Sequence, residues 1–213
     1  MCIETLEEHY GIPEARRIDP VDLLVATILS QNTTDKNSLR AFGRLKSSYP
    51  DYDALLRAPV SEIEEKSRVG GLSEMKARRI KESLAKIKAH AGSISLEFLK
   101  DMELQEAKEY LCSLPGVGLK TAAVVLLFAF GLAIMPVDTH VFRVSKRLGL
   151  VPEDVSIEAA QGVLEKITPS DKYMSLHINL IRHGRHICKA RNPIHSNCAL
   201  RELCDYYLRG HKT

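Results

Sequence analysis

The sequence predicts an all-α protein, and three observations support this. No stretch of the 213 residues shows the sustained alternation of apolar and polar residues, with hairpin turns, that is typical of strands. Leu, Ile, Ala and Val supply the apolar mass, whereas tryptophan is absent and only 6% of the residues are aromatic. Glycine and proline divide the chain into segments of helical length. The length suits one larger domain or two small ones.

The first half is expected to hold a buried helix among several amphipathic ones. The segment Val21–Gln31 places apolar residues on nearly every side, which predicts a helix buried all round, with Asp19 or Asp22 near its start. It ends in the polar run Ser30–Asp35, whose amides and hydroxyls either cap a helix or face nucleic-acid bases and phosphates. The other predicted helices of this half cover Thr5–Tyr10, Lys36–Tyr49, Asp53–Leu56, Ser61–Ser67 and Glu74–His90.

A glycine turn at Arg68–Ser73 precedes the last of these helices. It places Leu72 at its tip, where an apolar side chain either packs against its own loop or acts as a wedge between unstacked bases. The helix that follows, Glu74–His90, is expected to be basic on one face through Lys76, Arg79, Lys81, Lys86 and Lys88.

A second glycine turn lies at Leu114–Gly118, between predicted helices Leu104–Leu114 and Thr121–Phe130. Its glycines and proline force a sharp turn and expose backbone N–H groups at the start of the next helix. Such a helix start binds anions, and a nucleic-acid phosphate fits it. Lys120 follows directly, and Asp138 comes after the apolar run that Gly131 ends.

Lys120 and Asp138 each admit two interpretations. The positive end of the helix dipole and partial burial both disfavour a protonated lysine, so Lys120 is either a nucleophile that forms Schiff bases or a point charge on a phosphate. Asp138 is either the N-cap of the predicted helix Val141–Leu148 or a catalytic carboxylate, and both roles can hold at once. Further helices are predicted at Ile157–Ile167 and Lys172–His186.

Charge and hydropathy exclude some classes of protein. Lys and Arg total 30 against 27 Asp and Glu, and a net charge of +3 does not by itself indicate nucleic-acid binding. The basic residues of the last 32 positions do suggest a basic surface, although a solvated charged face also explains them. The first ten residues do not resemble a signal peptide, and Ala122–Val137 is too short and too interrupted for a membrane span. We therefore expect a cytoplasmic protein.

Three of the five cysteines crowd into the last part of the chain, which in a cytosolic protein indicates a metal site rather than disulfides. They are Cys188, Cys198 and Cys204.

Taken together, LPGVGLKTA and VDTHVFRV resemble the helix-hairpin-helix and Gly-Pro-Asp superfamily of DNA glycosylases, above all its endonuclease III branch. Three further segments are similar to parts of this family. The family's Ser-x-Gln helix end is matched by LVATILSQNTTDKN, and its wedge loop by VGGLSEMKARRI. The start of its cluster loop is matched by HGRHIC. The resemblance implies a helix-hairpin-helix motif with Lys120 as the nucleophile at the sugar C1′ and Asp138 as its supporting carboxylate. It also implies DNA contacts by the residues Gln31, Asn32, Leu72, Gly116, Val117, Gly118, Lys189 and Arg191.

The cluster loop departs from the family at one position. The family spaces four cysteines by six, two and five residues around a [4Fe–4S] cluster, whereas here the spacing is kept with the ligands Cys188, His195, Cys198 and Cys204. Imidazole ligates iron in Rieske centres, so we expect a [4Fe–4S] cluster with three cysteines and His195. Zinc and a [3Fe–4S] cluster with His195 unligated are the alternatives.

The resemblance implies a bifunctional DNA N-glycosylase and AP lyase, acting as a monomer on damaged pyrimidines or abasic sites in double-stranded DNA, nucleoid-associated in a prokaryote. Two domains are expected: a helical barrel, 18–132, and a discontinuous domain, 1–17 with 133–213, that carries the metal loop. The alternatives within the class are a monofunctional mismatch glycosylase for thymine, uracil or adenine, and an alkylbase glycosylase. A non-catalytic helix-hairpin-helix DNA-binding module is the alternative of another class.

Overall fold

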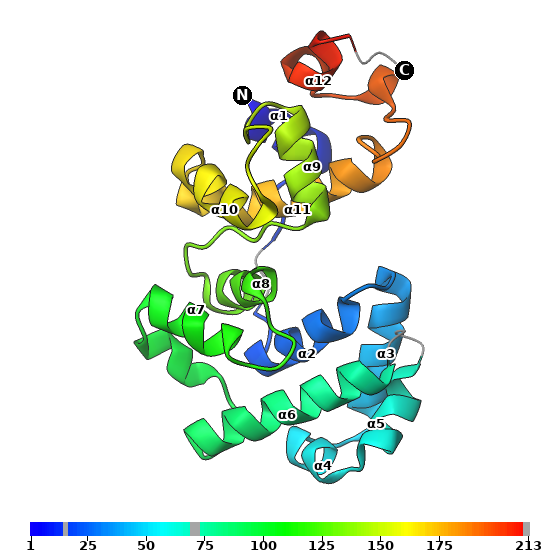
Figure 1. Cartoon of the computed structure of the whole chain (residues 1–213), viewed down its shortest axis with the longest axis vertical. Coiled ribbons are helices and arrows are strands. Elements are labelled where there is room, and N and C mark those ends of the chain that lie inside the picture. The colour runs from blue at the N-terminus through cyan, green and yellow to red at the C-terminus, as the bar shows by residue number, and fades with distance from the viewer. Residues whose placement is uncertain (15–16, 69–72, 211–213) are drawn as a thin grey trace. The chain divides into compact units, whose positions relative to one another are not determined.

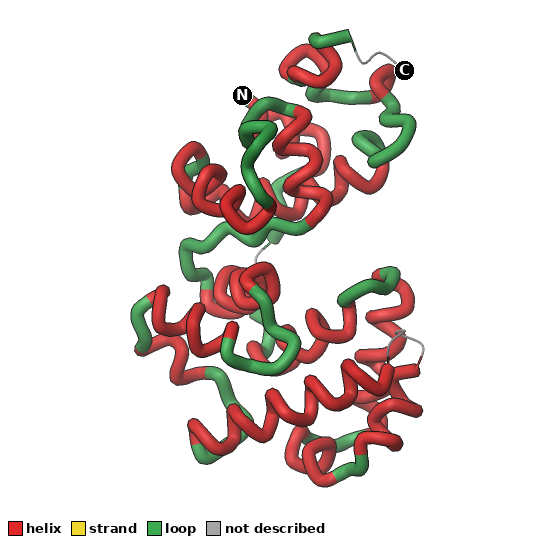
Figure 2. Tube along the Cα trace, viewed as in Figure 1, coloured by secondary structure: helices red, strands yellow, loops and turns green. Residues whose placement is uncertain are grey.

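The chain folds into helices joined by loops. The computed structural model describes residues 1–14, 17–68 and 73–210, and no strand occurs in these ranges (Figures 1 and 2). The all-α prediction is therefore confirmed. The chain divides into two compact units, a continuous unit, Arg17–Leu132, and a discontinuous unit made of Met1–Arg16 and Ala133–Thr213. Within the described ranges, no helix has the length and apolarity needed to cross a membrane.

The continuous unit is built around one buried helix. Its elements are α2 (Pro20–Ser30), α3 (Asp35–Ser48), α4 (Tyr52–Arg57), α5 (Val60–Ser67), α6 (Ser73–Ala91), η2 (Glu97–Asp101), α7 (Leu104–Cys112) and α8 (Leu119–Phe130). The central helix α2 packs against α3, α6 and α8, and its side chains Leu24 and Ile28 have no exposed surface. Asp19 caps it by accepting from the amides of Val21 and Asp22.

Helix α8 forms the other half of this core. Its residues from Thr121 to Leu127 are all buried, as expected for a helix that is apolar on every side. It ends at Gly131, which adopts the left-handed conformation with φ +70° and donates to the carbonyl of Leu127. The apolar run that followed Lys120 in the sequence is therefore a core helix.

The discontinuous unit joins the two ends of the chain. Its elements are α1 (Cys2–Tyr10), α9 (Thr139–Arg147), α10 (Ile157–Ile167), η3 (Ser170–Lys172), α11 (Tyr173–His186), η4 (His195–Asn197), η5 (Arg201–Leu203) and α12 (Asp205–Leu208). The central helix α11 packs against both α1 and α9.

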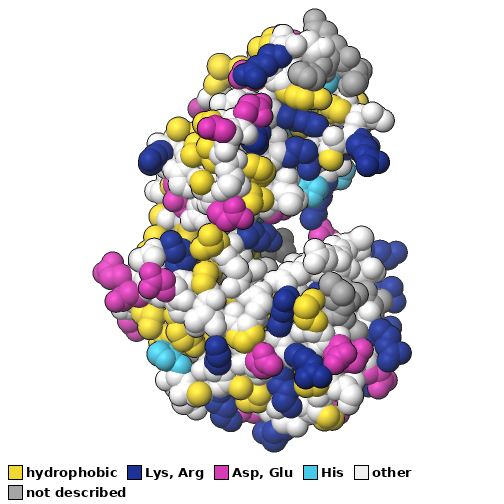
Figure 3. Space-filling model, viewed as in Figure 1, with side chains coloured by type: hydrophobic (Ala, Val, Ile, Leu, Met, Phe, Trp, Pro, Cys, Tyr) yellow, Lys and Arg dark blue, Asp and Glu magenta, His cyan; other side chains and the backbone are white. Residues whose placement is uncertain are grey.

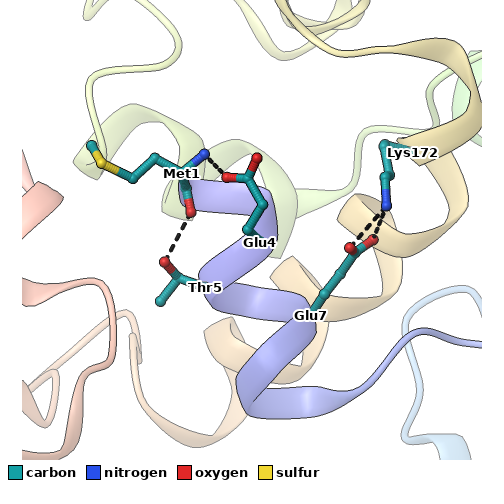
Figure 4. Close-up of polar contacts among 5 residues, drawn as sticks. All are labelled: Met1, Glu4, Thr5, Glu7 and Lys172. Carbon is teal, nitrogen blue, oxygen red and sulfur yellow. Dashed lines mark hydrogen bonds and ion pairs between the residues drawn. The ribbon is translucent and has the colours of Figure 1, made fainter.

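Polar contacts fasten the N-terminal helix α1 to the rest of its unit. Lys172 Nζ binds both carboxylate oxygens of Glu7, at 3.1 and 2.9 Å (Figure 4). At the far end of the helix, Nδ2 of Asn179 donates to the carbonyl of Gly11 at 3.0 Å. Glu4, whose side chain is exposed, pairs with the terminal amine of Met1 (Figure 4).

Charges of both signs are mixed over the surface. On the face drawn in Figure 3, the Lys and Arg side chains of the continuous unit alternate with Asp and Glu side chains and form no single basic field. This distribution agrees with the small net charge of +3.

Candidate active site

The hairpin between α7 and α8 is a tight turn that requires glycine. The amide of Val117 donates to the carbonyl of Leu114 at 3.1 Å, which closes the turn. Gly116 has φ +79°, and a β carbon at this position would lie 2.4 Å from Cδ of Arg79. Gly118 is the N-cap of α8 and has no side chain to cap it. The start of α8 therefore has unsatisfied backbone donors.

The two sides of this turn differ in their hydrogen bonding. The carbonyls of Ser113, Pro115 and Gly116 each accept a side-chain donor from another helix or loop of the continuous unit. By contrast, the amides of Gly116 and Gly118 donate to no partner within the described ranges. The turn is thus bound through its acceptors and presents its donors, as an anion site requires.

Lys120 lies in the first turn of α8, two residues after Gly118. Its side chain is half-buried, and the buried run of the helix begins at the next residue, Thr121. Lys120 therefore belongs to the turn of α8 that directly follows the hairpin.

Asp138 is the N-cap of α9 in the discontinuous unit. Its Oδ1 accepts from the amides of His140 and Val141, both at 2.8 Å, and no bond to Oδ2 occurs in the described part of the chain. Burial lowers the pKa of the neighbouring His140, an effect that the Asp138 carboxylate partly opposes. The capping role predicted for Asp138 is present, and one carboxylate oxygen is left for another partner.

The residues predicted to contact DNA differ in their surroundings. Gln31 is half-buried and bonded at both ends of its amide, to Gly116 and Arg79, whereas Asn32 is exposed with φ +51°. The side chain of Val117 is buried. Lys189 and Arg191 are exposed, as Asn32 is. Leu72 lies outside the described residues.

The basic residues of α6 bind partners inside the continuous unit. Lys76 is 1% exposed and donates to the carbonyl of Leu29 at 2.9 Å, at the C-terminal end of α2, where a cation is favoured. The other basic residues predicted for this face also have internal partners: Arg79 binds Gln31, Lys81 binds Ala58, Lys86 binds Ser113 and Lys88 binds Asp53. The predicted basic face therefore links α6 to neighbouring elements of the unit, because its cations bind their carbonyl and carboxylate oxygens.

The four candidate metal ligands line one pocket of the discontinuous unit, together with His183. Cys188, His195 and Cys204 are buried, and Cys198 is half-buried. Among the described residues, no three His, Cys, Asp or Glu side chains form a group that would hold a single metal ion. The donor set of three thiols and two imidazoles nonetheless has the chemistry that an iron–sulfur cluster or zinc requires.

Two arginines of α9 support the start of this loop, and sequence reasoning missed them. Arg143 donates to the carbonyls of Gly184, at 2.8 Å, and Cys188, at 3.0 and 3.2 Å. Arg147 donates to Sγ of Cys188 at 3.3 Å and to the carbonyl of Lys189 at 2.7 Å. Their spacing of four residues on the helix after Asp138 was the signal in the sequence.

His183 is a further residue of this site that the sequence did not single out. Its Nε2 lies 3.5 Å from Sγ of Cys198, and its Nδ1 lies 3.0 Å from the hydroxyl of Tyr10. Burial lowers its pKa to about 4. The signal available in the sequence was a histidine five residues before Cys188, the first cysteine of the loop.

Comparison with known proteins agrees with this geometry. Residues 25–170 match the HhH-GPD superfamily base excision DNA repair protein family. The chain is 36% identical to endonuclease III of Sulfolobus acidocaldarius, over 87% of this chain and 81% of that protein. It is 41% identical to endonuclease III of a Synechocystis species, over 87% and 80%. The solved structure of a trapped endonuclease III–DNA covalent intermediate matches with a TM-score of 0.82 at 32% identity, covering 99% of this chain and 96% of that chain. The family match spans more than half of the chain, which therefore belongs to the HhH-GPD superfamily of base excision DNA repair proteins.

Proposed function

We propose that this protein is a bifunctional DNA glycosylase and AP lyase that removes damaged pyrimidines from duplex DNA. One observation carries the proposal: Lys120 stands in the first turn of a helix whose preceding glycine amides are free to bind a phosphate. A phosphate held there brings the adjoining sugar within reach of the amine.

Lys120 is the nucleophile of this proposal. Its amine attacks C1′ of the extruded nucleotide, the C1′–N bond to the base breaks, and the base leaves with a proton from the amine. The C1′–O4′ bond then opens to give the imine, and removal of a C2′ proton breaks the C3′–O bond and releases the 3′ phosphate by β-elimination. The side chain of Lys120 is half-buried where the buried run of α8 begins. Mismatch thymine and uracil glycosylases usually lack this lysine, which favours the bifunctional enzyme over those alternatives.

Asp138 supports the charge that develops on the sugar as the base leaves. Its capping bonds fix the carboxylate through Oδ1, and the amide dipoles of α9 favour its ionised form. Oδ2 is the oxygen that we assign to the reacting nucleotide.

The DNA contacts divide between phosphates and the gap left in the base stack. Gly116 and Gly118 hold a backbone phosphate through their amides, whereas Val117 shapes the turn because its amide donates to the carbonyl of Leu114. Lys189 and Arg191 contact phosphates from the discontinuous unit. We assign filling of the gap to Leu72 and Asn32. Gln31 contributes to DNA binding indirectly, by holding the hairpin turn, because both ends of its amide are already bonded to protein groups.

The cysteine-rich loop is proposed to hold a [4Fe–4S] cluster through Cys188, His195, Cys198 and Cys204. The kept family spacing favours the cluster over zinc or a [3Fe–4S] cluster. Bound there, a cluster would supply metal–ligand bonds that fix the loop carrying Lys189 and Arg191. We further propose that the protein acts as a cytoplasmic monomer.

Borohydride trapping tests the lyase proposal directly. The purified full chain is incubated with duplexes that carry an abasic site or thymine glycol, and reduction converts the imine into a stable protein–DNA adduct. We expect an adduct from the wild type and from the control Lys108→Gln on α7, and none from Lys120→Gln. An adduct of undiminished yield from Lys120→Gln, or none from the wild type, would overturn the proposal. A non-catalytic DNA-binding module gives the second outcome.

A panel of lesion duplexes separates the glycosylase alternatives. The same strand is prepared with an oxidised pyrimidine, a mismatched thymine, a uracil, a mismatched adenine or an alkylated purine. We expect the fastest excision with the oxidised pyrimidine. A faster reaction with any other member assigns that lesion as the substrate instead.

A further inference from the structure

Helix α6 supports the carbonyl side of the hairpin turn. Ser83 Oγ donates to the carbonyl of Pro115 at 3.1 Å, and Lys86 Nζ donates to that of Ser113 at 3.0 Å. Arg79 lies four residues before Ser83 and seven before Lys86, so the three side chains share one face of the helix. That face is directed at the turn.

Arg79 reaches the turn through Gln31. Its Nη1 donates to Oε1 of Gln31 at 3.3 Å, and Nε2 of Gln31 donates to the carbonyl of Gly116 at 2.8 Å. A guanidinium only donates, so it selects the oxygen of the Gln31 amide and turns the NH₂ group toward Gly116. The arginine thereby fixes the orientation in which Gln31 can hold the turn.

Gly116 allows the stem of Arg79 to pack directly on the turn. A β carbon at position 116 would lie 2.4 Å from Cδ and 3.1 Å from Cγ of this arginine. Any other residue at this position would push the arginine away, in addition to the strain at φ +79°. Three separate features, two hydrogen bonds and a steric contact, thus join these residues.

We propose that Arg79 and Gln31 form a clamp that sets the position of the hairpin turn, and that Arg79 is a positioning residue for excision. The turn leads within two residues to Lys120, so its position determines where the amine stands. A displacement of about 1 Å in a reacting group costs roughly 100-fold in rate. The catalytic effect rests on the proposed function, whereas the effect of the clamp on the turn does not.

The adjacent arginine provides a matched control. Arg78 is exposed and pairs with Glu74 on the same helix, so Arg78→Met and Arg79→Met remove the same charge from neighbouring positions. We expect Arg79→Met to lower the single-turnover excision rate by about 10- to 100-fold, with duplex affinity and its salt dependence unchanged. We expect Arg78→Met to leave all three at the wild-type values.

The salt dependence distinguishes the clamp from a direct phosphate contact. If Arg79→Met weakens duplex binding and reduces the slope of log K against log salt by about one, Arg79 binds a phosphate and the clamp proposal is wrong. An equal loss of rate in both arginine variants would overturn it as well.

Amide hydrogen exchange tests the turn without DNA. We expect faster exchange at the hydrogen-bonded amides of residues 113, 114 and 117 in Arg79→Met and in Gln31→Leu, and no further increase when the two changes are combined, because each breaks the same bridge. Unchanged exchange in the single variants, or additive increases in the double variant, would overturn the clamp. This result stands even if the wild type excises no base, so the failure of the clamp and of the proposed function can be told apart.

The steric contact has its own measurement. Gly116→Ala is introduced into the wild type and into Arg79→Ala, and the melting temperature is recorded for all four proteins. The loss caused by Gly116→Ala should be smaller in the Arg79→Ala background, where only the backbone strain is left. Equal losses in the two backgrounds would overturn the packing of Arg79 on the turn.

Discussion

Oδ1 of Asp138 accepts the backbone amide of Val141 at 2.8 Å, so the carboxylate proposed for catalysis also begins helix α9. The two roles can be separated, because an asparagine keeps the acceptor and loses the charge. We expect the free energy of unfolding of Asp138→Asn to lie within about 0.5 kcal/mol of the wild-type value. We expect its excision rate to fall by about 100-fold or more. Thermal unfolding and single-turnover excision measure the two effects.

The alanine variant completes this comparison. Asp138→Ala removes the cap as well as the charge, and we expect it to lower the free energy of unfolding by about 1 kcal/mol. An Asp138→Asn protein with wild-type activity would show that the carboxylate serves only the helix.

The ion pair between Glu7 and Lys172 predicts a pH dependence. The hydrogen bonds from Lys172 lower the pKa of Glu7. The folded state therefore favours the ionised form, so the stabilisation is complete above the pKa of an unfolded glutamate, about 4.3, and is lost as the pH falls through the lower folded pKa. We expect Glu7→Gln to melt at a lower temperature than the wild type at pH 7. The difference between the two melting temperatures should shrink below about pH 4.

Glu4→Gln is the control for this prediction. Glu4 lies on the same helix, and its side chain is 69% exposed and pairs with the terminal amine. Its melting temperature should follow the wild type at every pH, and a gap as large as that of Glu7→Gln would point to helix charge in general rather than to the Lys172 pair.

The histidine in the cluster loop predicts a shift in reduction potential. Replacing a neutral imidazole by a thiolate adds negative charge to the cluster, which disfavours reduction. We expect His195→Cys to bind about four irons per chain, as the wild type does, and to show a lower reduction potential by protein-film voltammetry. Equal potentials would mean that His195 does not ligate the cluster, and stoichiometric zinc in place of iron would rule the cluster out.

Gly184 predicts a packing effect at the same site. A β carbon there would lie 3.1 Å from Nη2 of Arg143 and 3.2 Å from Cγ2 of Val144. We expect Gly184→Ala to lower the free energy of unfolding by about 1–3 kcal/mol, because it displaces the arginine that holds the Cys188 carbonyl. Gly162→Ala in α10 meets open space and should instead raise stability by about 0.5–1 kcal/mol. Urea denaturation measures both, and a stable Gly184→Ala protein would show that Arg143 can move at little cost.

The sequence predicted those features that depend on neighbours along the chain. Asp19, Gly131 and Asp138 end or begin helices where turn and cap chemistry places them, and the apolar run after Lys120 is a buried helix. Such features rest on hydrogen bonds over two to four residues, which the sequence displays directly.

What the sequence did not predict depends on contacts between distant segments. Lys76 and Leu29 are 47 residues apart, and Gln31 and Gly116 are 85 apart. A stripe of lysines and arginines has the same pattern whether it faces solvent or the carbonyls of another helix, so periodicity alone predicted a basic face on α6 without its partners. The roles of Arg143 and His183 were hidden for the same reason, because their partners lie on the cysteine loop and on α1.

The fastening of α1 to α11 also imposes an order on folding during synthesis. The hydrogen bond between Asn179 and Gly11 joins residues that are 168 positions apart in the sequence. The continuous unit lies wholly between these two residues. The continuous unit can therefore complete its core once Leu132 has left the ribosome, and α1 must wait for α11. Until then Leu6, which α1 buries in the folded protein, stays exposed to solvent.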